Sequence, residues 1–238
     1  LYTGDSSGSR SVTFDGNSDL QPDFVWTKGR SNSGDHFLHD SSRGVHKNIH
    51  SNTAQTETDN SNGLTAFNSD GFSMGNVGGM NYNGNTYVGW GWKANGASRT
   101  TFTESGANPG GGYQANTTAG FSIVKYVGVD SQTTTVGHGL DEAPEIVLVK
   151  ATSEDGRHWR MMAHPLKGNF GINRTDVVKF NDGSAVADDE NYWNDTAPTT
   201  SVFSVGDAND VNDTDCTFIA YCFHSVEGHL DIGVYKGN

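Results

Sequence analysis

The segments "PDFVWTK" (residues 22–28) and "PEIVLVK" (residues 144–150) are two versions of one pattern, each beginning with proline and ending with lysine. In the first segment, Phe24 and Trp26 alternate with Val25 and Thr27. Successive side chains of a strand project to opposite faces, so this alternation predicts a β-strand with two different faces. Its recurrence predicts that one β unit is present twice.

The neighbours of these segments recur in the same order. The matched pairs are Tyr2-Thr3-Gly4 with Tyr126-Val127-Gly128, His36-Phe37 with His158-Trp159, "GFSMG" (71–75) with "SVFSVG" (201–206), and "TYVGWGWK" (86–93) with "TFIAYCFH" (217–224). The offset grows from about 122 to about 131 residues, so the copies differ by loop insertions. The final "GVYKGN" (233–238) matches the opening Tyr-x-Gly and predicts the start of a third repeat.

Short alternating runs separated by turn signals such as "FDGNSD", "SDG" and "NGN" fill both copies. This spacing is typical of β-sandwiches and barrels, and no stretch has a sustained helical period. We therefore expect an all-β fold of two tandem antiparallel β-sandwich, jelly-roll-like units related by duplication. The predicted organisation is a first unit over 1–93, a Gly/Asn/Thr-rich linker over 94–120 and a second unit over 121–238.

The segment 86–92 has large side chains on one face, at Val88, Trp90 and Trp92, and glycines at 89 and 91 on the other. The glycines predict that a second layer packs closely on their face. We interpret the aromatic residues of the alternating runs as core: Trp26, Trp90, Trp92, Trp159, Tyr221 and Phe223.

Composition restricts the classes of function. The net charge is −13, which argues against nucleic acid and anionic membranes as partners, since both attract basic proteins. The sequence has neither a long apolar run for a membrane span nor a signal peptide. It starts at Leu1 without an initiating Met, which predicts a processed product or part of a longer protein.

The two cysteines, Cys216 and Cys222, lie in the alternating segment "CTFIAYC". Six residues of extended strand separate their Cα atoms by roughly 20 Å, beyond the reach of a disulfide. We expect two buried thiols.

Two short motifs resemble sites of chemistry. "GDSSG" (4–8) fits the elbow that presents a nucleophilic serine, but the required preceding strand and following helix are missing, so a turn is favoured. His46 and His50 have a spacing that suits zinc on a helix, with His36 and His39 nearby. On a strand, residues four apart are about 13 Å from each other, too far to share an ion.

The remaining metal candidate is the loop "GDANDVNDTD" (206–215), whose Asp207, Asp210, Asp213 and Asp215 could bind Ca²⁺ through oxygen. The first copy has no acid in the matching "GNVGGMNYNGNT", so a solvated acidic loop is favoured over a calcium site. We expect no cofactor.

Glycoside hydrolysis needs two carboxylates at a defined separation. Asp35, Asp40, Asp188, Asp189 and Glu190 are candidates that the sequence cannot place together. Exposed aromatic residues could instead bind sugars by stacking, as in lectin-like sandwiches. No catalytic constellation emerges, and we expect no enzymatic activity.

The phrases "PDFVWTKGRSNSGDHFLHDSSRG", "LTAFNSDGFSMG" and "YVGWGWKANG", with "TVGHGLDEAPEIVLVK", "YWNDTAPTTSVFSVG" and "FIAYCF" in the second half, resemble a repeat domain of unknown function. That domain is common in tail, fibre and other virion proteins of bacteriophages, notably those of marine bacteria. The resemblance covers nearly the whole chain, is weakest over 94–120, and carries no catalytic or binding residues.

Two hypotheses follow. The first is a non-enzymatic structural or adhesive protein of a phage tail, fibre or capsid surface, acting by multivalent contacts with other virion subunits in a homo-oligomer. The alternative is a host-recognition module that binds glycans or depolymerises polysaccharide.

Overall fold

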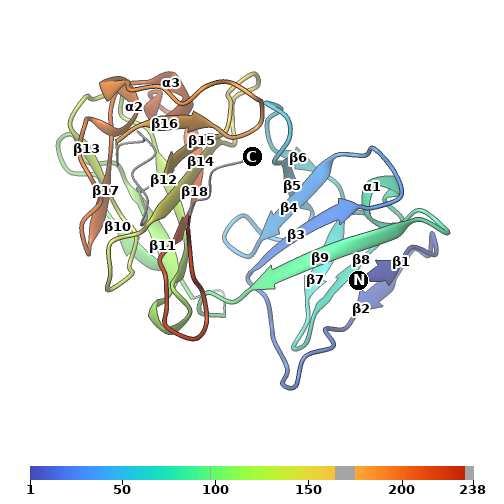
Figure 1. Cartoon of the computed structure of the whole chain (residues 1–238). Coiled ribbons are helices and arrows are strands. Elements are labelled where there is room, and N and C mark those ends of the chain that lie inside the picture. The colour runs from blue at the N-terminus through green and yellow to red at the C-terminus, as the bar shows by residue number, and fades with distance from the viewer. Residues whose placement is uncertain (97, 164–174, 234–238) are drawn as a thin grey trace, which may run out of the picture. The chain divides into compact units, whose positions relative to one another are not determined.

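The computed structural model describes residues 1–96, 98–163 and 175–233, and the chain divides into two compact units, Leu1–Ala97 (unit 1) and Ser98–Asn238 (unit 2) (Figure 1). Nearly all regular structure is antiparallel β-sheet, as the alternating sequence predicts. The start of the expected third repeat lies, apart from Gly233, outside the described residues.

Unit 1 contains a six-stranded sheet in the order β1-β9-β3-β4-β5-β6 and a three-stranded sheet in the order β2-β8-β7. The strands of the larger sheet are β1 (Tyr2–Thr3), β3 (Phe24–Gly29), β4 (His36–Asp40), β5 (Lys47–His50), β6 (Thr58–Asp59) and β9 (Thr86–Trp92). Those of the smaller sheet are β2 (Arg10–Val12), β7 (Leu64–Phe67) and β8 (Phe72–Met74).

The core of unit 1 lies between these two sheets. Val25 of β3 packs with Leu64 of β7, with Phe72 and Met74 of β8, and with Met80 of the one-turn helix α1 (Gly78–Asn81). All five side chains are fully buried. Alternation along each strand therefore places one face of each sheet in this core.

Unit 2 contains a seven-stranded sheet in the order β10-β11-β12-β18-β14-β15-β16 and a two-stranded sheet, β13-β17. The strands of the larger sheet are β10 (Thr100–Phe102), β11 (Gly111–Asn116), β12 (Phe121–Val127), β14 (Ile146–Ala151), β15 (Arg160–Ala163), β16 (Val177–Lys179) and β18 (Thr217–Phe223). The others are β13 (Thr134–Gly137), β17 (Val202–Val205), the helices α2 (Glu190–Trp193) and α3 (Asn209–Asn212), and the 3-10 turn η1 (Thr117–Ala119).

The core of unit 2 is larger. Tyr126, Val147, Val149, Trp193 and Phe203 belong to one cluster of fully buried side chains between the two sheets. Cys216 and Cys222 join the same cluster as free buried thiols, which confirms the prediction made from their strand spacing.

The two units share a strand order. The series β1-β9-β3-β4-β5 of unit 1 has the same pairing as β12-β18-β14-β15-β16 of unit 2, and β2-β8 corresponds to β13-β17. Register agrees as well, since Trp26 faces Trp90 and Leu148 faces Tyr221 at the matched positions.

Individual contacts also recur. Tyr2 stacks on Tyr87 with a centroid distance of 5.2 Å, and Tyr126 stacks on Phe218 at the same distance. The Tyr2 hydroxyl donates to the Met80 carbonyl, while the Tyr126 hydroxyl donates to the Val211 carbonyl. Tyrosines at matching strand positions, on β1 and β12, thus anchor the one-turn helices α1 and α3.

A buried asparagine is the last residue of each of these helices. Asn81 Oδ1 accepts from the Asp5 N–H, and its Nδ2 donates to the Ser7 and Gly75 carbonyls. Asn212 Oδ1 accepts from the Val129 N–H, and its Nδ2 donates to the Ser131 and Gly206 carbonyls. Each asparagine thus connects backbone groups of two separate loops by hydrogen bonds.

The predicted linker over 94–120 is wrong in part. It contains β10 and β11, and β11 pairs along its whole length with β12 of unit 2. Gly and Asn are frequent in this segment and hide the strand signal, but hydrogen bonding to the edge of β12 overrides their low β-propensity. Unit 2 therefore begins before residue 121.

One predicted match is shifted by one residue. Phe37 pairs with Thr27 of β3, and Arg160 pairs with Val149 of β14, so Arg160 takes the place of Phe37. Trp159 consequently corresponds to His36, not to Phe37. A one-residue shift moves a side chain to the other face of the sheet, so it changes which residues share a surface.

Candidate functional site

Three tryptophans form an apolar surface on β3 and β9 of unit 1, which we name the tryptophan patch: Trp26, Trp90 and Trp92. Trp26 and Trp90 meet edge to face with ring centroids 6.1 Å apart. Trp92 lies 5.2 Å from the ring of the buried Phe24. Together the three indoles line a shallow depression of about 240 Å³.

The prediction that all of these residues are core is wrong for the patch. Trp90 is 45% exposed, and Trp26 and Trp92 are half-buried. The inward face of β9 is the one with the glycines, where the Phe72 ring packs against Gly89 and the Phe14 ring packs against Gly91. The sequence correctly predicts this close approach, but alternation alone does not identify which face points to the core.

The matching surface of unit 2 is built differently. Leu148, Tyr221 and Phe223 occupy the positions of Trp26, Trp90 and Trp92. Tyr221 is fully buried, and the Trp159 ring stacks on it at a centroid distance of 6.2 Å and an angle of 23°. The core prediction holds for Tyr221 and Trp159, while Phe223 is half-buried.

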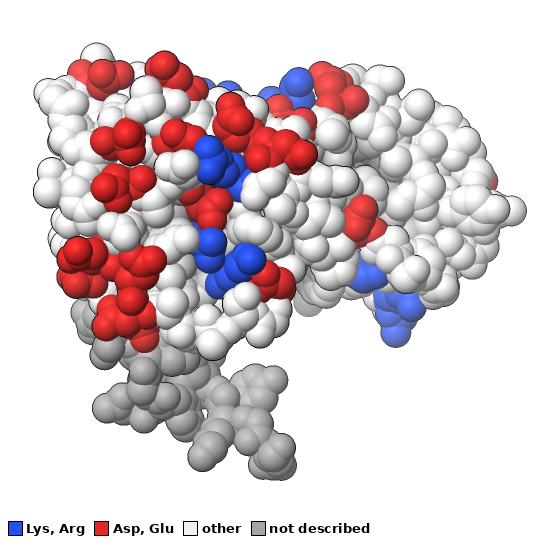
Figure 2. Space-filling view, turned by 90° about the horizontal axis from the view of Figure 1, so that it is seen from above, with Lys and Arg blue, Asp and Glu red and all other residues white. Residues whose placement is uncertain are grey.

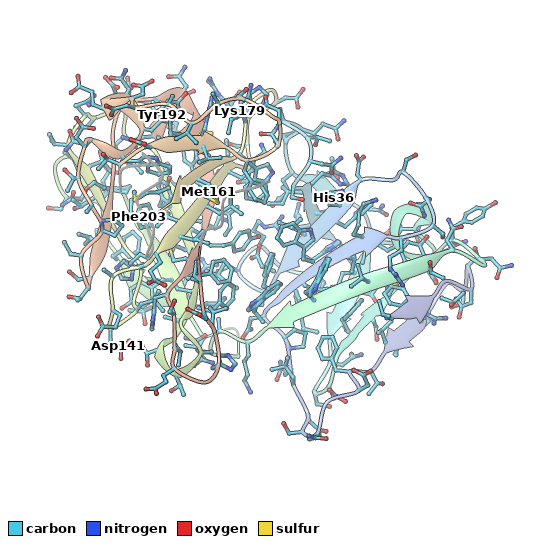
Figure 3. All side chains as sticks on the ribbon, in the orientation of Figure 1. His36, Asp141, Met161, Lys179, Tyr192 and Phe203 are labelled. Atoms are coloured by element: carbon cyan, nitrogen blue, oxygen red, sulfur yellow. The ribbon has the colours of Figure 1, made fainter. Side chains whose placement is uncertain are left out.

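Unit 1 has His36 where unit 2 has Trp159. His36, labelled in Figure 3, begins β4, and its Nδ1 lies 3.2 Å from the Ser51 hydroxyl. On the same sheet face, the Lys28 ammonium donates to the Asn32 and Gly34 carbonyls. His36 and Lys28, the polar side chains at this end of the sheet, thus form hydrogen bonds with loop residues.

The candidate calcium residues have other partners. Asp210 receives hydrogen bonds from the Arg160 side chain and the His158 N–H, and Asp213 pairs with Arg157. Asp207 and Asp215 are exposed. Within the described part of the chain, no group of three His, Cys, Asp or Glu side chains is arranged to hold a metal ion.

The candidate hydrolytic carboxylates are also used by the scaffold. Asp40 is fully buried in an ion pair with Arg43, which further contacts Glu57. Asp189 caps α2 by accepting from the Asn191 N–H, and Asp35 accepts from Asn52. Asp188 and Glu190 are exposed.

The "GDSSG" segment forms the turn that the sequence favours. Ser6 has a φ of 55°, and the Ser7 N–H donates to Asp5 Oδ1. In unit 2, Asp130 has a similar φ of 49° in the matching turn. Ser6 lies between two short strands, β1 and β2, and no helix follows it.

The four histidines considered as zinc ligands, His36, His39, His46 and His50, lie on β4, on β5 and in the turn between them. His46 lies in that turn with a φ of 71°, and His50 ends β5, where Asn48 Nδ2 lies 3.2 Å from its Nε2. His39 is fully buried, and neither of its ring nitrogens has a hydrogen-bond partner. Burial lowers the pKa of His39 well below its ordinary value, and the Arg43 charge adds to this effect.

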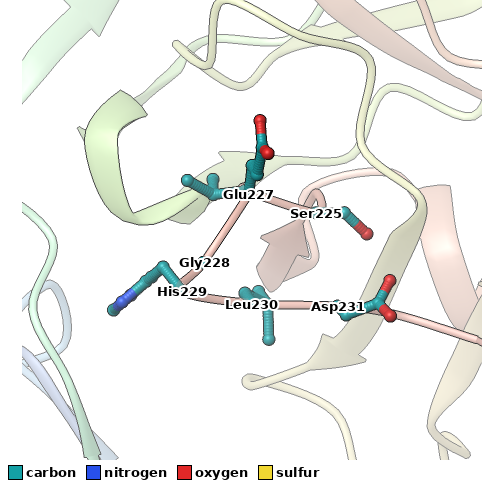
Figure 4. A pocket seen from close by; sticks show the side chains of 7 residues that line it. Ser225, Glu227, Gly228, His229, Leu230 and Asp231 are labelled. Atoms are coloured by element: carbon teal, nitrogen blue, oxygen red, sulfur yellow. The ribbon is translucent and has the colours of Figure 1, made fainter.

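A second concave region lies in unit 2, formed by Ser225–Asp231. Its volume is about 530 Å³, but the side chains of Glu227, His229 and Asp231 point in different directions (Figure 4). The loop is closed by hydrogen bonds between the backbones of Val226 and Leu230. The acidic groups therefore do not converge on a common point.

Charge is unevenly spread. On the face seen in Figure 2, Asp and Glu side chains are scattered over unit 2 with a few Lys and Arg among them. No helix of the described residues has the length and apolar character to cross a membrane.

Sequence reasoning missed the tryptophan patch, although the glycine face of 86–92 was the signal that could have located it.

The profile of a family described as "Domain of unknown function (DUF7483)" matches residues 1–238. No curated protein and no solved structure matches the chain.

Proposed function

The chain belongs to the DUF7483 family, whose description gives no function, and we propose that it is a non-enzymatic structural and adhesive component of a phage virion. In this proposal it consists of two copies of one β-sandwich, related by duplication, and acts through multivalent surface contacts. The observation that carries the proposal is the recurrence of one hydrogen-bonded scaffold in the described parts of both units, where no reactive group recurs with it.

The duplication is supported by matched side-chain roles. Asn81 and Asn212 bind the same two loops in their units, and Tyr2 and Tyr126 bind the same one-turn helix. Such agreement in donor, acceptor and position is expected of copies of one ancestral unit. A repeated scaffold displays related surfaces at fixed spacing, which suits a protein whose role is assembly and attachment.

The absence of activity is proposed because the candidate groups have structural roles. Three of the candidate carboxylates form ion pairs with arginine side chains: Asp40, Asp210 and Asp213. A fourth, Asp189, caps helix α2. Catalysis requires a nucleophile with a base, a metal cage or paired carboxylates of different pKa. A purified chain that released reducing ends from a host polysaccharide would contradict this part of the proposal.

Multivalency supplies the affinity that single weak contacts lack. Linked modules can raise avidity about 10²–10⁴-fold without any new contact. We therefore expect a homo-oligomer whose subunits bury more than about 1,000 Å² of interface, the lower limit for a specific contact.

Immunogold labelling tests the location directly. An antibody raised against the full chain should label intact phage particles whose genome carries this sequence. Particles without the gene serve as the control. Label found in the infected lysate but absent from purified particles would refute a virion role.

The alternative, a glycan-active module, is favoured by one observation, the half-exposed tryptophan patch. A depolymerase would need two facing carboxylates beside it. The three side chains that line the depression are all indoles, so this surface supports binding and not cleavage.

A further inference from the structure

Strand β1 forms one edge of the six-stranded sheet of unit 1. The Gly4 N–H donates to the Asn85 carbonyl, on the side of β9. Backbone groups of successive residues in an antiparallel strand point to opposite sides, so the N–H and the carbonyl of Thr3 face away from β9. Among the strands that the structure describes, β9 alone pairs with β1. Unit 1 therefore presents a backbone donor and a backbone acceptor to which another strand can bind.

Unit 2 shows what this edge can take. The matching strand β12 pairs on one side with β18, as β1 pairs with β9, and on its other side with β11 over six residue pairs. Val127, which takes the place of Thr3, donates its N–H to the Gly110 carbonyl just before β11. The strand that fills the edge in unit 2 is thus antiparallel to β12, and it has no counterpart among the described strands of unit 1.

A pocket of about 110 Å³ lies beside this edge and is lined by residues of both sheets of unit 1. The rings of Tyr2, Phe14 and Phe72 form its apolar walls, while the exposed Thr13 and Asp15 add polar groups. This volume is several times the roughly 30 Å³ that a water molecule occupies in the liquid. The pocket therefore has room for one side chain.

The matching place in unit 2 is filled by the hairpin of β10 and β11. Strands β13 and β17 match β2 and β8 in register, so Gly139 takes the place of Asp15. The Tyr113 ring of β11 packs directly on Gly139, where a Cβ atom would overlap it. The Phe102 ring of β10 lies beside Gly137, and both rings pack against the core of unit 2. Unit 2 thus receives aromatic side chains at the position where unit 1 has a pocket.

The size of the site decides which kind of partner fits it. The pocket is lined by eight residues and β1 spans two, whereas a protein interface that is stable on its own uses about 20–30 residues on each side. A free dimer held only at this site would therefore not persist. A segment of a neighbouring subunit can still bind, because contacts elsewhere in an assembly raise its effective concentration.

We infer that the free edge of β1 and the adjacent pocket accept an extended segment of a neighbouring virion subunit, which pairs antiparallel with β1 and inserts one tyrosine side chain. Tyrosine suits the pocket because its ring meets apolar walls, while its hydroxyl reaches the polar groups of Thr13 and Asp15. In strand addition, main-chain hydrogen bonds give affinity and the side chain in the pocket gives specificity. The inference rests on the proposed structural role and names a contact through which unit 1 joins the assembly.

The test is a titration of the full chain with a fluorescently labelled peptide that has the sequence of residues 98–116, followed by fluorescence anisotropy. This peptide contains the hairpin of β10 and β11, which fills the matching edge of unit 2. We expect a Kd of roughly 0.1 mM, in the weak range that multivalency reinforces. The peptide variant Tyr113→Ala should bind at least tenfold more weakly, and it leaves the protein unaltered.

Two variants of the protein separate pairing at the edge from other contacts. Thr3→Pro removes the outward N–H and keeps the hydrogen bonds to β9, since proline is tolerated on an edge strand where the N–H faces solvent. We expect it to weaken binding at least tenfold. Thr3→Ala is the matched control, because it removes the same side chain, keeps the N–H and should bind within about twofold of the wild type. Equal melting temperatures of the two variants exclude misfolding.

The outcomes are distinct. If the peptide does not bind, or if it binds Thr3→Pro and Thr3→Ala equally, the inference is wrong. A site already filled by a segment of the same polypeptide would also leave the peptide unbound and would overturn the inference. Where Thr3→Pro lowers the melting temperature, the two peptides decide, since equal binding of both by the wild-type protein contradicts insertion of the tyrosine. Labelling of virions by the antibody does not depend on this titration, so the proposed structural role can survive such a result.

Discussion

Arg160 of β15 and Asp210 of α3 form an ion pair in which Nε and Nη2 lie 2.8 and 2.6 Å from the same carboxylate oxygen. Both side chains are mostly buried, and the Arg160 guanidinium also lies 4.6 Å from the ring centroid of Tyr192, which is labelled in Figure 3. Unit 1 makes the same connection between sheet and helix with a different chemistry. There the Phe37 ring packs so closely on Gly79 that a Cβ atom would overlap it.

The ion pair predicts a large cost for removing one partner. Asp210→Ala should lower the free energy of unfolding by about 3 kcal/mol, because it leaves the Arg160 charge buried without its carboxylate. Chemical denaturation measures the change. Asp207→Ala, an exposed acid of the same loop, should cost less than about 0.5 kcal/mol.

The contact between Phe37 and Gly79 in unit 1 suggests how the stability lost in Asp210→Ala could be restored. The double variant Arg160→Phe with Asp210→Gly recreates the Phe37–Gly79 contact and should be more stable than Asp210→Ala alone. Equal stability of the two variants would show that the units do not share this packing position.

The buried asparagines predict a strong preference for the amide. In Asn212→Asp, a carboxylate oxygen would replace the Nδ2 group that now donates to the Ser131 and Gly206 carbonyls. Facing acceptors repel, so we expect a loss of at least about 2 kcal/mol. Asn81→Asp should behave alike, whereas Asn83→Asp, at an exposed position, should be nearly neutral in the same denaturation experiment.

Truncating the two aromatic residues at matched positions should have unequal effects. Tyr221→Ala removes a fully buried ring and should cost about 3–5 kcal/mol. Trp90→Ala removes a ring that is 45% exposed and should cost about 1 kcal/mol or less. Comparable melting temperatures for the two variants would contradict the assignment of opposite burial.

Alternation in the sequence predicts the strands β3, β9, β14 and β18, because the side-chain period of a strand is a local property. It does not predict which face of β9 points inward. That depends on Phe14 and Phe72, which fill the space above Gly91 and Gly89 and come from distant segments. Such partners decide which side chains are buried. Because the local pattern does not show these partners, it predicts a core position for Trp90.

The register of β15 was beyond the sequence for a related reason. His36-Phe37 and His158-Trp159 are similar in residue type, and seven residues separate each pair from the preceding matched lysine, Lys28 or Lys150, so the sequence gives no sign of a shift. Backbone pairing places Arg160 opposite Val149 and thus moves Trp159 to the face of Tyr221. That single step places Trp159 beside Tyr221, whereas the matching residue of unit 1 is His36.

The last prediction concerns acid. His39 is fully buried on β4, on the face of Val25. A Cβ atom at Gly63, the residue before β7, would lie only 3.4 Å from His39 Nε2. Thr27 Oγ1, also buried, has no hydrogen-bond partner either. Desolvation by burial is the largest cause that lowers the pKa of His39. The charges of Arg43, His50 and His46 lower this pKa further.

The direction of the pH effect on stability follows from the protonation of His39 in the unfolded and the folded protein. In the unfolded chain His39 takes up a proton near pH 6.5, whereas in the folded protein it stays neutral to much lower pH. The unfolded state therefore binds more protons below pH 6.5, and stability falls as the pH decreases, by at most about 1.4 kcal/mol per pH unit for one group. Above that pH the effect vanishes.

The measurement compares the full chain with His39→Leu between pH 7.5 and 5. His36, His50 and His138 also have lowered pKa values, and they contribute the same slope to both proteins. The difference between the two unfolding curves thus isolates His39. We expect His39→Leu to lose less stability on acidification than the wild type, because an apolar side chain of similar size needs no partner and binds no proton. Parallel curves would mean that His39 finds a hydrogen-bond partner or water in solution, and the acid sensitivity would then have to originate elsewhere.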